Sequence, residues 1–422
     1  IMTITALGAV IGLVVAIALI IYKFPPVYGM MLGAIVGGLV GGASLASTIG
    51  FMVKGASGMT SGILRIIAAG MLAGFLIDSG SAQTIAHFIV KKMGKKFSLL
   101  AIIVAAWVLQ AVGTFGDVVV IIVAPIALDI ACRTNYSKAA ASIALIGGIH
   151  AGNVVSPNPN TIALSENLGL PMTSVIMAGF IPALVGLAIT YIFVLMLKEY
   201  GEKVDESSLE VPQGEEGLPP FSKAIIGPIF TIVLLMLRPI VGITIDPILA
   251  LPLGGVVGTI ANGQTKKMLQ YATTGISRMS GIVLLLLGTG TIAGIVSNSA
   301  LKELLITSVD ALGMTGYILA PLSGILMGGA TASCVAGATV ASQVFGPTIL
   351  SFGVTPVQAA AMIHTGCCVF DCLPHGSFFH ISAGTLRMSI NERMRVLPYE
   401  SLIGFGMTVV ATIIFGFLRF TF

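Results

Sequence analysis

The amino-acid sequence predicts an all-α polytopic membrane protein. Only 9% of its 422 residues are charged, against roughly 25% in an ordinary soluble domain. Hydrophobic residues make up 56% of the chain, and the mean hydropathy is +1.04. Apolar runs of about 20 residues, long enough to cross a bilayer as helices, recur along it. This composition excludes a soluble enzyme, a secreted disulfide scaffold and a nucleic-acid-binding protein, and it makes the lipid bilayer an expected partner.

One long hydrophilic segment divides the chain. Residues 198–223 contain seven acids and three lysines, and they separate residues 1–197 from residues 224–422. Short stretches of the two parts match in the same order; for example, residues 70–79 resemble residues 290–299. We therefore expect two repeats of nearly equal length, joined by a hydrophilic linker.

Loop charges indicate how the two repeats are oriented. Residues 91–96 contain four lysines, whereas the matching loop near 311–316 is uncharged. The loop at 387–395 contains three arginines, whereas its match near 166–173 has no basic residue. Basic loops stay in the cytoplasm, so matching loops lie on opposite sides, which predicts inverted-topology repeats. The linker is then cytoplasmic, both ends of the chain lie outside, and the membrane is the inner (plasma) membrane.

Each repeat is expected to cross the membrane five times, the odd number that inversion requires. Segments 97–132 and 317–350 begin and end on the same side and are interrupted by glycines, so we expect each to form a re-entrant or broken-helix hairpin. The predicted spans lie near residues 3–22, 27–46, 58–88, 140–165, 174–197, 224–243, 247–263, 280–306, 356–385 and 399–421.

Polar residues gather at four interruptions of the apolar runs, at matched positions in the two repeats. Pro157 and Pro159 forbid a regular helix there. A helix that begins after Pro159 would aim its backbone N–H groups and positive dipole end at an anion. A second helix start near Thr331 and Ser333 would arrive from the opposite side, and two such ends favour a carboxylate. The alternative is that these residues only kink packed helices. The expected substrate-binding residues are Thr114, Asp117, Asn153, Ser156, Asn158, Asn160, Thr161, Thr331, Ser333, Thr339, His375 and Ser377.

Acids inside spans are candidates for ion coupling, because a carboxylate there is costly and is functional by default. Asp117 is the sharpest candidate, since a buried carboxyl can exchange a proton near neutral pH. The alternative is that Asp117 caps a broken helix. Asp371, His150 and His364 are the other residues expected to couple transport to protons or a cation.

Two further groups have both a functional and a structural interpretation. Histidines, cysteines and an aspartate lie together between residues 364 and 380. Their spacing fits no standard zinc pattern, so we expect no metal site and no other cofactor. Arg65 lies within a predicted span. It could bind a substrate carboxylate, although such an arginine more often snorkels or pairs with an acid.

At these residues the sequence resembles the gluconate permease (GntP) family of the ion-transporter superfamily. Residues 113–125 (GTFGDVVVIIVAP) resemble that family's phenylalanine–acid–apolar–proline stretch, with Asp117 in place of the usual Glu. Residues 329–336 (GATASCVA) resemble its hairpin motif, and residues 156–160 (SPNPN) its proline-rich motif. Residues 373–377 (LPHGS) depart from the family's histidine–asparagine–aspartate stretch.

The resemblance implies a symporter of small organic monoanions such as sugar acids, hydroxy acids and related carboxylates. It implies coupling to protons, or to sodium as in some relatives. It also implies a homodimer in which a scaffold, here spans 1 and 2 of each repeat, supports a transport domain that moves as an elevator.

We therefore expect a secondary active transporter and not an enzyme. The alternatives are a sodium-coupled symporter and a cation/proton antiporter, in which the same acids would bind sodium without an organic solute. An intramembrane enzyme would use the His, Cys and Asp residues between 364 and 380. A channel is disfavoured because no filter motif or ring of repeated charges is present.

Overall fold

The structure is a computed structural model that describes residues 4–22, 24–94, 97–204, 217–301, 304, 307, 316–374 and 376–420. Within these residues the chain is helical and contains no β-strand, only two isolated bridges. The all-helical prediction is thus confirmed. By length and composition, four of the described segments are apolar enough to cross a membrane: 60–78, 172–197, 265–297 and 390–417.

Helix starts in the chain follow local capping rules. Short polar side chains stand just before many helices and accept a hydrogen bond from a backbone N–H group of the first turn. Thr355 and Ser389 go further, because each forms a reciprocal capping box with a residue three positions later, Gln358 or Glu392. The other side-chain caps include Thr5, Ser44, Ser137, Asn158, Asp246 and Ser333.

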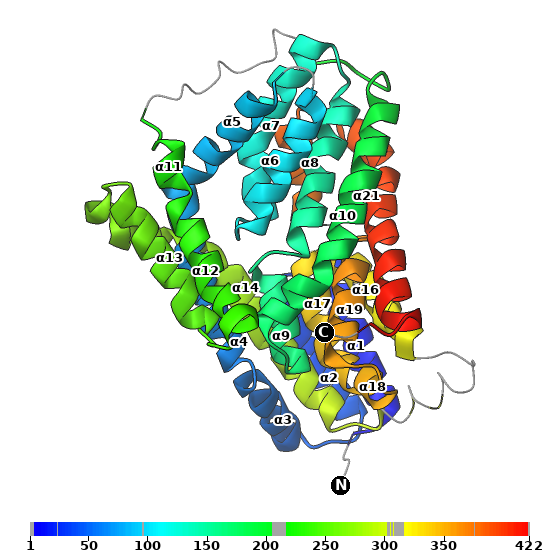
Figure 1. The fold of residues 1–422 in the computed structure, drawn as a ribbon. Helices are drawn as coiled ribbons and strands as arrows, with labels where there is room; N and C mark the ends of the chain where they lie inside the picture. The colour runs from blue at the N-terminus through cyan, green and yellow to red at the C-terminus, as the bar shows by residue number, and fades with distance from the viewer. Residues whose placement is uncertain are drawn as a thin grey trace.

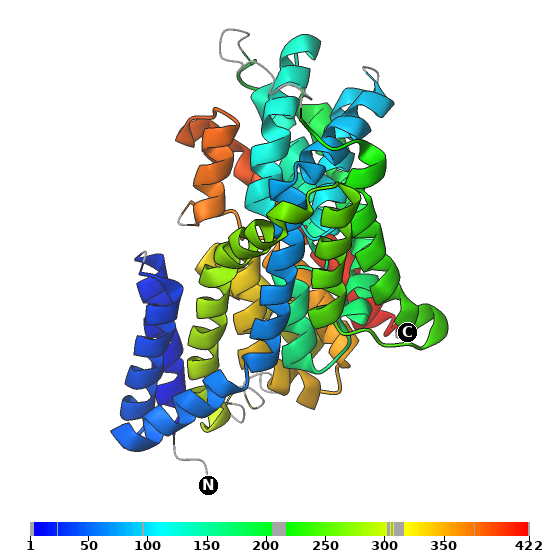
Figure 2. The ribbon, with the colours of Figure 1, turned by 90° about the vertical axis from the view of Figure 1, so that its left-hand side faces the viewer.

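A first group of helices extends from the left side of Figure 1 to its lower centre. In it, α4 packs against α13 and α14, while α1 packs against α2. Figure 2 shows α1 and α2 at one edge of the molecule, with α3 running across below them. The group consists of α1 (Ala6–Ile21), α2 (Pro26–Val40), α3 (Leu45–Ser57), α4 (Thr60–Asp78), α12 (Ile226–Val241), α13 (Pro247–Ala261) and α14 (Met268–Ser297).

A second group forms the rest of the molecule. Within it, α8 packs against α6 and α10, α16 packs against α19, and α10 packs against α21. Helices α5 and α11 contact each other through the stacked rings of Phe88 and Phe221. Its members are α5 (Ser81–Met93), α6 (Ser98–Ala111), α7 (Gly116–Thr134), α8 (Lys138–Asn153), α9 (Pro159–Leu168), α10 (Met172–Leu197), α11 (Phe221–Ala224), α16 (Gly316–Thr331), α17 (Cys334–Val344), α18 (Gly346–Ser351), α19 (Pro356–Cys367), α20 (Ser377–Thr385), α21 (Ile390–Ala411) and a π-helical turn, Thr412–Phe417.

The predicted interruptions are present in the described residues. Helices α6 and α7 form a hairpin whose tip is residues 112–115, and α16 and α17 form one whose tip is residues 332–333. The predicted run 140–165 is broken between α8 and α9, and the run 356–385 between α19 and α20. The run 58–88 was predicted as one span, but it is two helices, since α4 ends at Asp78 and α5 begins at Ser81. Gly80, with φ of +78°, makes the turn between them.

The two groups meet along a seam that includes the broken helices. Helix α9 of the second group packs against α4 of the first, and α17 packs against α14. Both α9 and α17 begin at an interruption and are short, at 10 and 11 residues. These two helices therefore place Asn160, Thr161 and Thr339 in the interior of the molecule, where all three are buried.

Candidate functional site

The four interruptions come together in space. The first hairpin tip turns at Gly113, whose φ of +100° is a left-handed conformation that suits glycine. A Cβ atom built on Gly113 would lie 3.6 Å from Cγ of Pro157, in the break between α8 and α9. The second tip lies against the break between α19 and α20, where a Cβ atom on Gly376 would collide with the carbonyl oxygen of Ala332. Each hairpin tip thus faces the break of a neighbouring helix.

Asn153, at the end of α8, is the centre of a buried polar network that we call the Asn153 cluster. Its Oδ1 accepts hydrogen bonds from Nδ2 of Asn158 at 2.6 Å, from Nδ2 of Asn160 at 2.8 Å and from Nε2 of Gln110 at 3.3 Å. Its Nδ2 donates to Sγ of Cys334 at 3.1 Å. One amide therefore links α6, α8, α9 and α17, and both of its polar atoms are used by protein groups.

The start of α9 is fixed by its own side chains. Oδ1 of Asn158 accepts from the backbone N–H of Thr161 at 3.1 Å, and Oγ1 of Thr161 donates to the carbonyl oxygen of Ser156 at 2.7 Å. Oγ of Ser156, Oδ1 of Asn160 and Oγ1 of Thr114 are buried and have no hydrogen-bond partner among the described residues. Unpartnered buried polar atoms are costly, so these three are available to a polar ligand.

The start of α17 repeats part of this arrangement. Oγ of Ser333 caps the helix by accepting from the N–H of Ala336 at 3.3 Å. The hydroxyls of Thr331 and Thr339 donate back to carbonyl oxygens of their own helices, each at 2.7 Å. Sγ of Cys334, the first residue of α17, lies 3.6 Å from Sγ of Cys368 at the end of α19. The two helix starts are thus joined through the Asn153 cluster.

Two predicted coupling residues, the buried His150 and the half-buried Asp371, form a pair. Nε2 of His150 lies 3.2 Å from Oδ1 of Asp371, and Sγ of Cys372 lies 3.5 Å and 3.4 Å from the same two atoms. These three side chains have ligand atoms close enough to hold a metal ion, as do Cys334, Cys368 and Asp371. Hydrogen bonds account for the distances among His150, Asp371 and Cys372. The absence of a metal site stays a prediction.

The remaining predicted residues are more isolated. Asp117 lies in the first turn of α7, where no hydrogen bond or ion pair joins it to another described residue. The ring of His364 is buried, and neither of its nitrogens has a partner within the described part of the chain. Ser377 is exposed at the start of α20, and His375 lies outside the described residues.

The sequence missed several members of these networks. Gln110 stands in an apolar run, Cys334 in the motif 329–336 and Cys368 in the group between residues 364 and 380, and only the fold brings the three to Asn153. Arg393 was counted with the basic loop, but its side chain is fully buried within α21 and forms two hydrogen bonds with Glu400, at 2.6 and 2.9 Å. The signal for this pair was the acid seven residues later, two turns along the same helix face.

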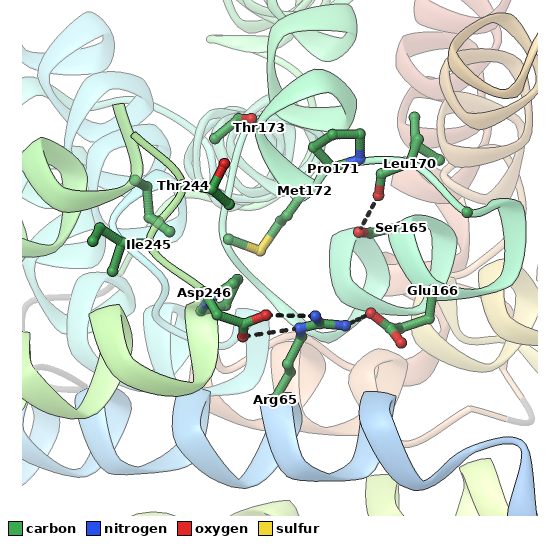
Figure 3. Close-up of a pocket in the computed structure, with 13 residues that line it drawn as sticks. Arg65, Ser165, Glu166, Leu170, Pro171, Met172, Thr173, Thr244, Ile245 and Asp246 are labelled. Atoms are coloured by element: carbon green, nitrogen blue, oxygen red, sulfur yellow. Dashed lines mark hydrogen bonds and ion pairs between the residues drawn. The ribbon is translucent and has the colours of Figure 1, made fainter. Parts of the chain in front are cut away.

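Arg65 has two acidic partners beside a cavity of about 440 Å³. Its guanidinium forms two hydrogen bonds with Asp246, from Nη2 at 2.6 Å and from Nε at 3.2 Å, and pairs through Nη1 with Glu166. Figure 3 shows Arg65 between the two carboxylates, with Thr173 and Thr244 across the cavity. The interpretation of Arg65 as the partner of an acid is therefore confirmed.

Apolar helices interrupted in pairs, with polar helix starts meeting inside the bundle, define a multi-pass membrane transporter. The chain belongs to the GntP permease family, whose model (GntP family permease) matches residues 1–251. A second family model, described as Na⁺-H⁺ antiporter family, matches residues 222–312. The predicted family is thereby confirmed, and with it the prediction of a permease rather than an enzyme.

Individual relatives agree with this assignment. An uncharacterized transporter of Haemophilus influenzae is 50% identical over 99% of this chain and 100% of its own length. The D-serine transporter DsdX of Escherichia coli is 21% identical over 96% of each chain. A high-affinity gluconate transporter of the same species is 21% identical over 88% of this chain and 89% of its own. The fold is shared with the YdaH transporter of Alcanivorax borkumensis, with a TM-score of 0.67 and 16% identity over 88% and 89% of the two chains.

Proposed function

We propose that this permease is a secondary active transporter of a small organic anion, a sugar acid, hydroxy acid or related carboxylate, by proton-coupled symport. Relatives across nearly the whole chain are named for gluconate and D-serine, and both of these solutes carry a carboxylate. The observation that carries the proposal is the convergence of two helix starts, α9 and α17, on one network that contains unpartnered polar atoms.

The chemistry of this region suits a single carboxylate. Helix N-termini present free N–H groups and a partial positive charge, which together bind an anion without a cationic side chain. Asn160 and Ser156 would add hydrogen bonds to the hydroxyl or amino groups of the solute. Asn153 has a different role in this proposal, because its amide is already saturated by protein groups: it positions the two asparagines of α9.

Coupling is proposed to involve Asp117 and the pair of His150 and Asp371, with His364 as a further candidate. A carboxyl group that lacks a fixed partner, such as that of Asp117, can gain and lose a proton without breaking an ion pair. The second candidate function is sodium coupling or cation/proton antiport. It is favoured by the match of residues 222–312 to the Na⁺-H⁺ antiporter family.

We further propose the architecture in which this cycle would run. The parts 1–197 and 224–422 would be inverted repeats, with the linker 198–223 in the cytoplasm. Spans 1 and 2 of each repeat would form a scaffold, and the broken helices would move against it as an elevator within a homodimer in the inner membrane.

The proposal is tested by uptake into proteoliposomes. The solutes are gluconate, glycerate, lactate, 3-hydroxybutyrate, serine and citrate, each with an inward proton gradient and, separately, with a sodium gradient. Saturable uptake of a monocarboxylate driven by the pH gradient is the expected result. Cation-driven proton movement without any solute uptake would overturn it in favour of the antiporter.

The role of Asp117 is tested in the same vesicles. Asp117→Asn should abolish accumulation against a solute gradient, since the variant cannot carry the coupling proton. Asp129→Asn is the matched control, because Asp129 lies on the same helix and pairs with Arg133 at 2.8 Å. Proton-driven accumulation that persists in Asp117→Asn would remove the coupling role of Asp117.

A further inference from the structure

The partners of Arg65 differ in how firmly they are held. Asp246 caps α13 through a 2.8 Å hydrogen bond from the N–H of Ile248, and it occupies two guanidinium nitrogens of Arg65. Because α4 and α13 pack against each other, this pair lies within the first helix group. The contact that the structure shows for Glu166 is with Nη1, which also donates to Oγ of Ser61 at 3.0 Å, and Glu166 belongs to α9 of the second group. A two-point arginine–carboxylate pair is stronger than a one-point contact, so Glu166 is the partner that exchanges more easily.

The charges around the cavity also single out Glu166. Among the described residues that line it, Arg65 is the only basic one, and it faces two carboxylates, so these three side chains sum to −1. If a solute monocarboxylate replaced Glu166 on Nη1, Arg65 would still be paired with two carboxylates. The side chains of Arg65 and Glu166 are each 20% exposed, so water reaches both and the exchange does not require a dry ion to be extracted.

Glu166 and the candidate site lie on the same helix, α9. It lies six residues after Asn160 on the same helix, which is about 9 Å along the axis. The cavity also borders the turn 169–171 between α9 and α10, which belongs to the segment 166–173 that the charge pattern assigns to the outside. A carboxylate that replaced Glu166 on Arg65 would break the ion pair between the end of α9 and α4, while the start of the same helix lies in the Asn153 cluster.

We propose that the Arg65 cavity is an outer docking site for a small monocarboxylate, which takes the place of Glu166 on Arg65 and thereby frees α9 from the first helix group. This inference rests on the proposed function, since it assumes that the solute carries a carboxylate. Thr173 and Thr244 supply hydroxyls on the opposite wall for the polar groups of the solute.

Two substitutions with opposite expected signs test the proposal in proteoliposomes. Glu166→Gln removes the competing carboxylate, so the KM for uptake of gluconate or glycerate should fall. The expected decrease is roughly two- to fivefold, which corresponds to the free energy of a partly exposed ion pair. Arg65→Gln removes the anchor, so KM should rise. An ion pair with only a structural role would lower the amount of folded protein in both variants and leave KM unchanged.

A matched control is available on α4, the helix that carries Arg65. Asp78 of α4 pairs with Arg278 of α14 at 2.8 Å, with side chains that are 19% and 33% exposed. This pair does not line the cavity, so Asp78→Asn should leave KM at the wild-type value. If Glu166→Gln does not fold, Glu166→Asp, whose shorter side chain weakens the contact, should lower KM by less. An unchanged or higher KM in the folded Glu166 variant would overturn the proposal.

Binding in detergent separates failure of this inference from failure of the proposed function. Gluconate should raise the thermal unfolding temperature of Glu166→Gln by more than it raises that of the wild type. If wild-type vesicles took up none of the tested solutes, the proposed function would be contradicted. Equal stabilisation of the two proteins by gluconate would sink the docking site, whatever the uptake results.

Discussion

Two arginines of this permease each pair with carboxylates, yet their surroundings differ. Arg393 and Glu400 lie on one helix, and their side chains are 0% and 1% exposed. Arg393 also donates to Oγ of Ser382 at 3.0 Å and stacks over the ring of Phe379. Arg65 instead joins three elements and is partly hydrated. A fully buried pair cannot lose a partner without leaving a bare charge. Arg65 can exchange one of its two carboxylate partners. The Arg393–Glu400 pair is therefore suited to stabilising a fixed structure, and the contacts of Arg65 are suited to a conformational change.

Breaking the buried pair should have the largest effect. Glu400→Gln leaves the guanidinium of Arg393 without its counter-ion in a dry site, which costs about 3–5 kcal/mol. The expected result is a large drop in the thermal unfolding temperature in detergent, measured with an intrinsic fluorescence or light-scattering scan. The double variant Arg393→Met, Glu400→Leu should recover most of the loss, because it removes both charges together. A Glu400→Gln protein as stable as wild type would show that the pair is not structural.

A charge placed in the neutral Asn153 cluster should have an intermediate effect on stability and a large effect on transport. In Asn153→Asp, the carboxylate still accepts from Asn158, Asn160 and Gln110, so the cluster keeps its donors, but it loses the bond to Cys334 and gains a negative charge. Stability should fall by about 1–3 kcal/mol, and solute uptake should fall at least tenfold, because the charge repels an anion.

The control for this substitution is Asn262→Asp. Asn262 donates to Oγ of Ser81 at 3.0 Å, far from either hairpin tip in the chain, and is half-buried. Uptake by this variant should match the wild type. If Asn153→Asp also transports at the wild-type rate, the solute does not approach the Asn153 cluster.

The smallest expected effect concerns pH and the Arg65 cavity. Hydrogen bonds from Arg65 hold the pKa of the Asp246 carboxyl below its usual value. A depressed folded-state pKa stabilises the protein above the unfolded value, about 4, and this contribution disappears as the pH falls through the folded value. The unfolding temperature should therefore decline below about pH 4, and Asp246→Asn should make that decline shallower. A steeper decline in the variant would contradict this assignment.

The interruptions of the fold could be predicted from sequence because their causes are local. Gly113, Pro157 and Pro159 impose their backbone conformations wherever they occur, and the matched positions in the two parts gave a second indication. Asn158 and Thr161 were also accessible to sequence reasoning, since a polar residue before a proline-started helix caps it.

The partners across the bundle could not be predicted in the same way. Gln110 is a single polar residue within an apolar run and Cys334 lies in a separate interruption, and their meeting with Asn153 depends on how four helices pack. The charge pattern along the chain places Arg393 in a basic loop, whereas its partner Glu400 lies seven residues later on the same face of α21. Glu166 and Asp246 lie about a hundred and about one hundred and eighty residues from Arg65, and no local pattern connects them.

The contact between Cys334 and Cys368 has a practical consequence for measuring motion. Both thiols are buried where the second hairpin tip meets α19, whereas Cys132 is partly exposed. A thiol reacts only when a reagent reaches it. In a Cys132→Ser background, the alkylation rates of Cys334 and Cys368, measured separately from those of Cys367 and Cys372 by peptide mass spectrometry, would thus report how often the hairpin separates from α19, in the way that hydrogen exchange reports local opening. Adding solute during the reaction would then reveal whether occupancy slows or speeds that separation, with no probe introduced into the site.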